Sequence, residues 1–157
     1  MAATWQNLNF LDSDEMKLIK FDIDVQRQII ALGLDDFSPN AMLPNVHGGQ
    51  YGASPEEWRK SVFLLACALM AAGLVSALPG REEYQAKSSE EIQTLLQNGD
   101  PKNGFDVDLV WDVIHFYGTE KLIMLLRKLD LNEWKAMQTG LSLPLGKALV
   151  ELNVVHL

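Results

Sequence analysis

The chain has 157 residues, with 21 acidic and 13 basic side chains and a formal net charge of −8 at pH 7. This length suits one domain with a sizeable core, so we expect a single domain over residues 1–157. Apolar residues make up 48% of the chain and charged residues 22%, which excludes a disordered or fibrous protein. Proteins that bind nucleic acid by neutralising phosphates are usually basic, so the charge argues against direct nucleic-acid binding.

The first residues and the cysteine content both favour a cytoplasmic protein. Residues 1–7 contain no basic segment followed by an apolar stretch, so the sequence predicts no secretory signal. The single cysteine, Cys67, cannot form an internal disulfide. Because Cys67 lies in an apolar run, we expect a buried thiol that behaves as a small hydrophobic side chain.

The segment 13–34 carries two overlapping patterns. Met16, Ile19 and Ile23 recur at helical spacing, whereas residues 19–25 alternate between apolar and polar side chains as a strand does. We favour a helix over the whole segment. The choice between helix and strand stays open for residues 19–25, and with it a minor β contribution in the N-terminal part.

Residues 35–53 hold two prolines and three glycines, which predicts a loop. Within it, His47, Gln50 and Tyr51 stand among glycines that let a ligand approach the backbone closely. Because His47 and Tyr51 can exchange protons, these three residues form a candidate ligand loop. The spacing matches neither a P-loop nor a dinucleotide fingerprint, and a plain connector that docks Tyr51 onto the core is the alternative.

One apolar helix is expected to form the centre of the fold. Ser54 and Glu57 have the spacing of a capping box around Pro55, so the helix should run from about residue 55 to 75. Residues 62–78 carry no charge and are apolar on all sides, which is typical of a helix buried all round. The run is nearly long enough to span a membrane, but its alanine content and flanking charges favour a core helix.

Shorter helices are expected along the rest of the chain, each starting at a capping residue. They cover residues 88–96, 106–118, 119–129, 130–137 and 145–152. The sequence therefore predicts a mainly α, compact multi-helix domain around the apolar helix.

Catalytic and metal-binding motifs are not evident. His47, His115 and His156 are too far apart in sequence for a local metal pair, and no nucleophile motif occurs. We expect His115 to be half-buried on a helix, where Asp112 could orient its ring. The sequence thus predicts a non-enzymatic protein with no catalytic residue, metal or cofactor.

Most of the net negative charge lies in residues 82–120, which hold nine acidic and two basic side chains. Acidic residues are common at helix N-termini, so a solvated face is one interpretation. The other is a surface that steers and docks a basic protein. The residues expected to bind such a partner are Glu90, Glu91, Asp106, Asp108 and Asp112.

In general composition the chain resembles the small acidic immunity and antitoxin proteins of bacteria. That resemblance covers no specific motif and transfers no residue, but it implies a protein that blocks a basic toxin with negative charge. A phage-type inhibitor of a host defence protein predicts the same surface. A small enzyme that uses the loop from His47 to Tyr51 is a third hypothesis. The sequence does not indicate an oligomeric state.

Overall fold

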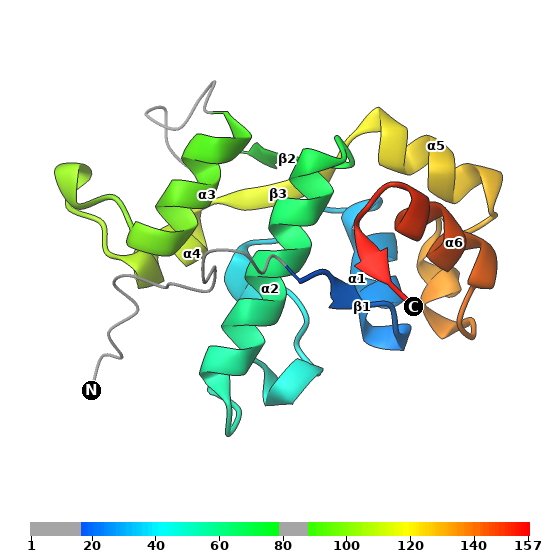
Figure 1. Ribbon diagram of the computed structural model, residues 1–157, viewed down its shortest axis with the longest axis horizontal. Helices are drawn as coiled ribbons and strands as arrows, with labels where there is room; N and C mark the ends of the chain where they lie inside the picture. The colour runs from blue at the N-terminus through cyan, green and yellow to red at the C-terminus, as the bar shows by residue number, and fades with distance from the viewer. Residues whose placement is uncertain (1–16, 79–87) are drawn as a thin grey trace.

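The computed structural model describes residues 17–78 and 88–157, and it is mainly α-helical with short strands (Figure 1). The helices are α1 (Ile23–Leu32), α2 (Pro55–Ala71), α3 (Ser89–Asn98), α4 (Val107–Val113), α5 (Glu120–Lys128) and α6 (Leu143–Glu151). Short 3-10 helices are η1 (Pro39–Ala41), η2 (Val46–Tyr51), η4 (Pro101–Asn103) and η5 (Trp134–Gln138). The strands are β1 (Ile19–Lys20), β2 (Val75–Leu78), β3 (His115–Gly118) and β4 (Val155–His156).

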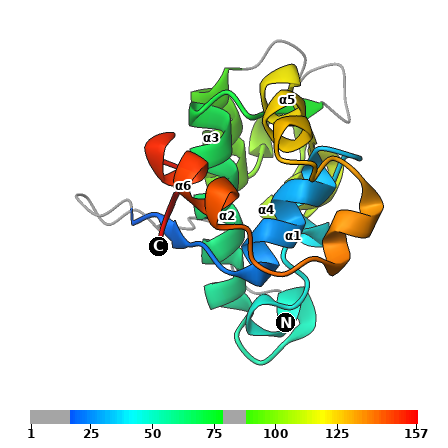
Figure 2. The ribbon, with the colours of Figure 1, turned by 90° about the vertical axis from the view of Figure 1, so that its right-hand side faces the viewer.

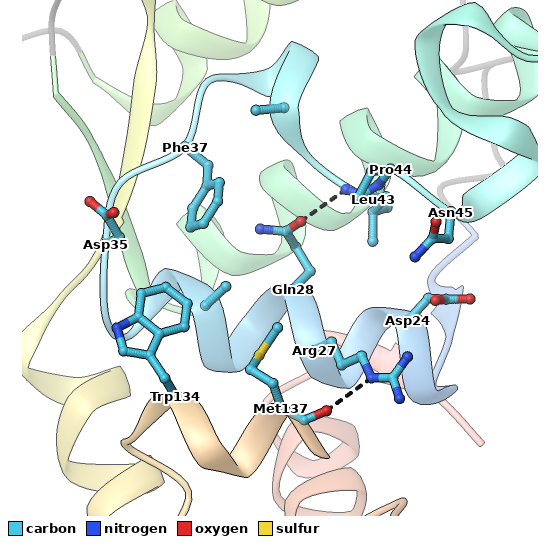
Figure 3. Close-up of a pocket in the computed structure, with 12 residues that line it drawn as sticks. Asp24, Arg27, Gln28, Asp35, Phe37, Leu43, Pro44, Asn45, Trp134 and Met137 are labelled. Atoms are coloured by element: carbon cyan, nitrogen blue, oxygen red, sulfur yellow. Dashed lines mark hydrogen bonds between the residues drawn. The ribbon is translucent and has the colours of Figure 1, made fainter. Parts of the chain in front are cut away.

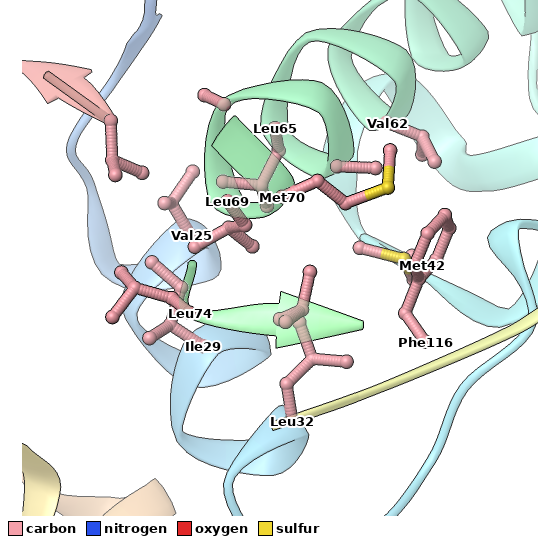
Figure 4. Packing of buried hydrophobic residues seen from close by; sticks show 14 of the residues in the cluster. Val25, Ile29, Leu32, Met42, Val62, Leu65, Leu69, Met70, Leu74 and Phe116 are labelled. Atoms are coloured by element: carbon pink, nitrogen blue, oxygen red, sulfur yellow. The ribbon is translucent and has the colours of Figure 1, made fainter. Parts of the chain in front are cut away.

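Helix α2 is the centre of the fold, as predicted. It has α3 and α4 on one side and α1, α5 and α6 on the other (Figure 1). From Val62 to Met70 every side chain except that of Leu64 is buried. Figure 4 shows side chains of α1, including Ile29, packed together with Leu69 of α2 and other members of this core. No helix of the described ranges is long and apolar enough to cross a membrane.

The two ends of α2 differ from the sequence prediction. Pro55 is the first residue, but among the described residues Ser54 makes no side-chain capping bond, so the predicted capping box is wrong. The helix ends at Ala71, several residues before position 75. Gly73 then adopts a φ of +74°, a left-handed conformation that glycine tolerates at low cost, and it turns the chain into β2.

A two-stranded antiparallel sheet replaces the end of one predicted helix. β2 pairs with β3, with Val75 opposite Gly118 and Leu78 opposite His115. The expected helix over 106–118 therefore stops at Val113. The reason is that β3 has hydrogen-bonding partners on both sides, because Phe116 also bridges to Phe37.

Residues 19–25 turn out to be strand first and helix afterwards. Ile19 and Lys20 form β1, which pairs in parallel with β4, and the Phe21 amide donates to the His156 carbonyl over 2.8 Å. Asp22 then caps α1 by accepting a hydrogen bond from the Val25 amide at 2.9 Å. A helix over the whole of 13–34 is thus wrong for residues 17–22 and 33–34, and residues 13–16 lie outside the described part.

The later helices begin close to their predicted caps. The capping box of Ser88 and Glu91 is present at the start of α3, and Asp106 caps α4. Residues 130–137 differ, because Asp130 has a φ of +58° and the helix there begins only at Trp134, as η5. The loop predicted over 35–53 contains two short 3-10 helices.

The connection between α3 and α4 offers a test of this geometry. Gly99 has a φ of +72° and a Cβ there would lie 2.8 Å from the Val107 nitrogen, whereas Gly104, with a φ of +81°, has open space around it. Gly99→Ala should lower the free energy of unfolding by about 2–4 kcal/mol. Gly104→Ala should cost about 1 kcal/mol, for the left-handed conformation alone. Urea denaturation measures both, and equal losses would contradict the close approach at Gly99.

Candidate functional site

A buried cation lies where α2 meets α4. The Arg59 side chain is only 6% exposed, and its Nη2 lies 2.5 Å from Oδ1 of Asp108. The guanidinium also stacks over Trp111, with 4.7 Å between Cζ and the ring centroid. Burial lowers the pKa of Arg59, and the charges of Asp108, Asp112 and Asp106 act against that shift. Arginine stays protonated in proteins, so the first turns of α4 surround a fixed positive charge with carboxylates.

Beside this ion pair the surface is hollowed. The cavity has a volume of about 300 Å³, and we call it the Arg59 hollow. Its lining residues are Asn40, Gln50, Tyr51, Arg59, Asp108 and Asp112. Asn40 donates to Asp112 Oδ1 over 2.7 Å, which joins η1 to α4. Tyr51 at the rim is 91% exposed, although an aromatic ring is usually at least partly covered.

The loop that carries Tyr51 is held by α2 and by its own glycines. The indole nitrogen of Trp58 donates to the carbonyls of Met42 and Leu43 over 3.0 and 3.1 Å. Gly49 has a φ of +74°, and a Cβ there would lie 2.7 Å from the Pro44 carbonyl oxygen. The position of Tyr51 therefore depends on a glycine and on a buried tryptophan.

Two sets of residues that the sequence suggested separately meet at this hollow. Asp108 and Asp112 come from the acidic set, and Gln50 and Tyr51 come from the candidate ligand loop. His47 belongs to the same loop but does not line the hollow, and it is exposed with a φ of +52°. Proximity of this kind comes from the packing of η2 against α2, which no local sequence pattern encodes.

The remaining acidic residues have structural contacts of their own. Asp106 accepts a hydrogen bond from the Leu109 amide at 2.9 Å as the cap of α4. Glu91 accepts from the Ser88 amide at 3.0 Å in its capping box. Glu90 is exposed on α3, beside a different cavity that is also lined by Cys67. These glutamates do not line the Arg59 hollow.

Sequence reasoning missed Arg59 and Asn40, and it misplaced the partner of His115. Arg59 could have been noticed in the sequence because it is a basic residue in the first turns of a helix whose later residues are all apolar. His115 lies on β3, not on a helix, and its Nδ1 is 2.7 Å from Oδ2 of Asp36. The predicted orienting role of Asp112 is therefore wrong, because that carboxylate accepts from Asn40 instead.

The hydrogen bond between Asp36 and His115 makes the free energy of unfolding depend on pH in the acid range. The hydrogen bond with His115 lowers the pKa of Asp36 below its ordinary value of 3.8. A carboxyl group whose pKa is depressed by folding stabilises the fold above its unfolded-state pKa. This contribution is lost as the pH falls through the lowered value. It is small, because both side chains are about 40% exposed.

The hollow contains two carboxylates that can contact a positively charged group. It offers carboxylates, a phenol and two amide side chains around one guanidinium that is already paired. Within residues 17–78 and 88–157, no three His, Cys, Asp or Glu side chains gather closely enough to hold a metal ion. Comparisons of the chain with family models, curated proteins and solved structures return no match.

Removing the charge of Asp108 should weaken the fold, because the buried guanidinium of Arg59 then faces a neutral amide oxygen instead of a carboxylate. Loss of one member of a fully buried pair costs about 3–5 kcal/mol. The Asp108 side chain is 48% exposed, so we expect Asp108→Asn to lower the free energy of unfolding by about 1–2 kcal/mol. Asp112→Asn, at an exposed carboxylate, is the matched control and should cost less than about 1 kcal/mol. Equal effects in urea denaturation would contradict the special role of Asp108.

The thiol of Cys67 should be inert in the folded protein. Burial raises its pKa to about 12, so almost no thiolate exists at pH 8. An aromatic disulfide reagent should therefore modify native protein at least about a hundred times more slowly than protein in urea. Reaction rates followed by absorbance measure this ratio, and comparable rates would show that α2 opens readily.

Proposed function

We propose that this is a non-enzymatic protein that docks a basic protein partner through the Arg59 hollow, which accepts a lysine or arginine side chain. One observation carries the proposal: the carboxylates of Asp108 and Asp112 and the 91% exposed ring of Tyr51 converge on a single cavity of about 300 Å³. A carboxylate and an aromatic face are the two groups that proteins most often use to bind a cationic side chain.

The charge balance of the site favours a cation. Three carboxylates of α4 act on Arg59, so the surroundings remain negative after the ion pair is counted. Each carboxylate can accept several hydrogen bonds, and Asp108 is still 48% exposed after binding Arg59. Its orientation is fixed by that bond, so an incoming cation meets an acceptor that is already in place.

Tyr51 supplies the apolar part of the contact. Tyrosine is among the residues enriched at the energetically important centres of interfaces. A ring that is 91% exposed gains from being covered, and it can stack on the incoming cation. The surrounding acidic residues would then speed association at low salt.

As the partner class we propose a bacterial toxin, with this chain as its immunity protein in the cytoplasm. The support is the acidic surface of α4 and its hollow. A phage-type inhibitor of a host defence protein would use the same surface, and the identity of the partner separates the two. The enzyme hypothesis gains nothing from the geometry, because His47 does not line the hollow.

The test is affinity capture from lysate of the source cells, with a variant that changes the hollow without changing the fold. Charge reversal at Asp106 and Asp108 is unsuitable, because it also removes the cap of α4 and the counter-ion of Arg59. Tyr51→Ala with Asp112→Asn, which we call the hollow variant, leaves both in place. Met124→Ala with Glu151→Gln removes one exposed apolar side chain and one charge elsewhere, as the matched control.

We expect a basic protein to be held by the wild type and the control at low salt, and released at high salt. The hollow variant should bind the purified partner at least about tenfold more weakly, a loss of 1.4 kcal/mol or more. Equal affinities of the hollow variant and the control for that partner would contradict the proposed site.

A further inference from the structure

A second cavity shares no lining residue with the Arg59 hollow. It has a volume of about 420 Å³, which falls within the range of small-molecule sites. It lies where η5 packs along α1, two elements that run side by side in Figure 2. Gln28 of α1, Phe37 and Leu43 of the following segment, and Trp134 and Met137 of η5 line it (Figure 3).

A buried amide group lines this cavity, and its donor nitrogen makes no hydrogen bond among the described residues. Gln28 is only 5% exposed, and its Oε1 accepts a hydrogen bond from the Leu43 amide over 2.9 Å. That bond fixes which atom is oxygen, so the other is the Nε2 donor. Nε2 is buried and meets no acceptor among the described residues. In Figure 3 it points toward Phe37, inside the ring of lining residues.

An unsatisfied buried donor costs free energy, so its presence calls for an explanation. A ligand that brings an acceptor into the cavity would satisfy it. The terminal torsion of glutamine is soft, so a small rotation presents Nε2 to such an acceptor while Oε1 keeps its bond to Leu43. The acceptor of the ligand therefore has a defined place near Gln28.

The walls of the cavity indicate the rest of the ligand. The indole of Trp134 is 54% exposed, and Phe37 stands near it on the same side of the cavity (Figure 3). Two aromatic side chains of this kind suit a flat ring. The rim carries Asp24, Asp35 and Arg27, and the Arg27 Nε donates to the Met137 carbonyl over 3.2 Å. Two carboxylates against one guanidinium disfavour an anion, and the apolar side chains of the walls favour a neutral ring over a cation that would have to lose its water.

We propose that this cavity binds a neutral, flat ring compound that bears a carbonyl-type acceptor. The acceptor receives a hydrogen bond from Gln28 Nε2, and the ring lies against Phe37 and Trp134. This site is separate from the surface proposed for the basic partner, and neither depends on the other.

The test uses 1-indanone and indane, two neutral compounds with the same fused-ring skeleton, of which only the first has a carbonyl oxygen. Binding is followed by nuclear magnetic resonance of the ¹⁵N-labelled protein, including the side-chain amide signal of Gln28. We expect 1-indanone to bind about fivefold more tightly than indane, the ratio that one net hydrogen bond supplies. Both compounds should shift the side-chain amide signal of Gln28 because both place an aromatic ring near it, and 1-indanone should shift it further and downfield, as a new hydrogen bond does.

Three variants locate the site. Ala41→Leu places a larger side chain on the cavity wall and should abolish binding of both compounds. Ala71→Leu makes the same change at an exposed position at the far end of α2 and should leave binding unchanged. Gln28→Glu keeps an acceptor for the Leu43 amide and removes the donor once the carboxyl group is ionised, so at pH 9 it should abolish the preference for 1-indanone.

Three results would overturn the proposed ligand site. Absence of binding by 1-indanone overturns the proposal, and so does equal affinity for the two compounds or full binding by Ala41→Leu. The hollow variant at Tyr51 and Asp112 should bind 1-indanone as the wild type does. Failure of the partner-docking proposal therefore leaves this result unaffected.

Discussion

The neighbouring side chains of Trp58 and Arg59 near the start of α2 organise one side of the molecule. Trp58 holds the segment before α2 through two carbonyls, and Arg59 holds α4 through Asp108 and Trp111. The two tryptophan rings lie 5.9 Å apart between centroids. Because a buried charge is costly unless it is paired, the Arg59–Asp108 bond fixes how α4 sits on α2. The η1 and η2 segments, α4 and the hollow between them all take their places from this pair of residues.

The helices were the part of the fold that the sequence could predict. Capping residues such as Ser88 and Asp106 mark helix starts locally, and an apolar run without charges marks a buried helix. The strand pairs could not be predicted in this way. Residues 74–78 continue the apolar run of α2, so hydrophobicity does not reveal the turn, and only Gly73 hinted at it. The pairing of β1 with β4 depends on residues more than a hundred positions apart.

The candidate sites show the same division between local and distant information. Acidic residues and a glycine-rich loop stand out in the sequence, but only the packing of η2 and α4 on α2 brings Asp112 and Tyr51 to one hollow. The burial of Gln28 is even harder to predict from the sequence. This residue lies within the helical stretch Val25–Leu32, beside Gln26 and Arg27, where a glutamine looks like a surface residue. Its burial becomes evident only when η5 packs against α1. Whether a polar residue in a helix is exposed or lines a cavity thus depends on the tertiary contacts around it.

The parallel pairing of β1 with β4 also has a consequence for how the chain is made. Ile19 lies opposite Val155, so β1 has no strand partner until almost the whole described chain has left the ribosome. Closing so long a loop is entropically costly and slow compared with forming a helix. Before that moment Phe21, which is 4% exposed in the finished fold, lacks part of its cover. The nascent chain therefore passes through a stage in which the Phe21 side chain is accessible to chaperones, and Phe21 is fully covered only once β4 has been made.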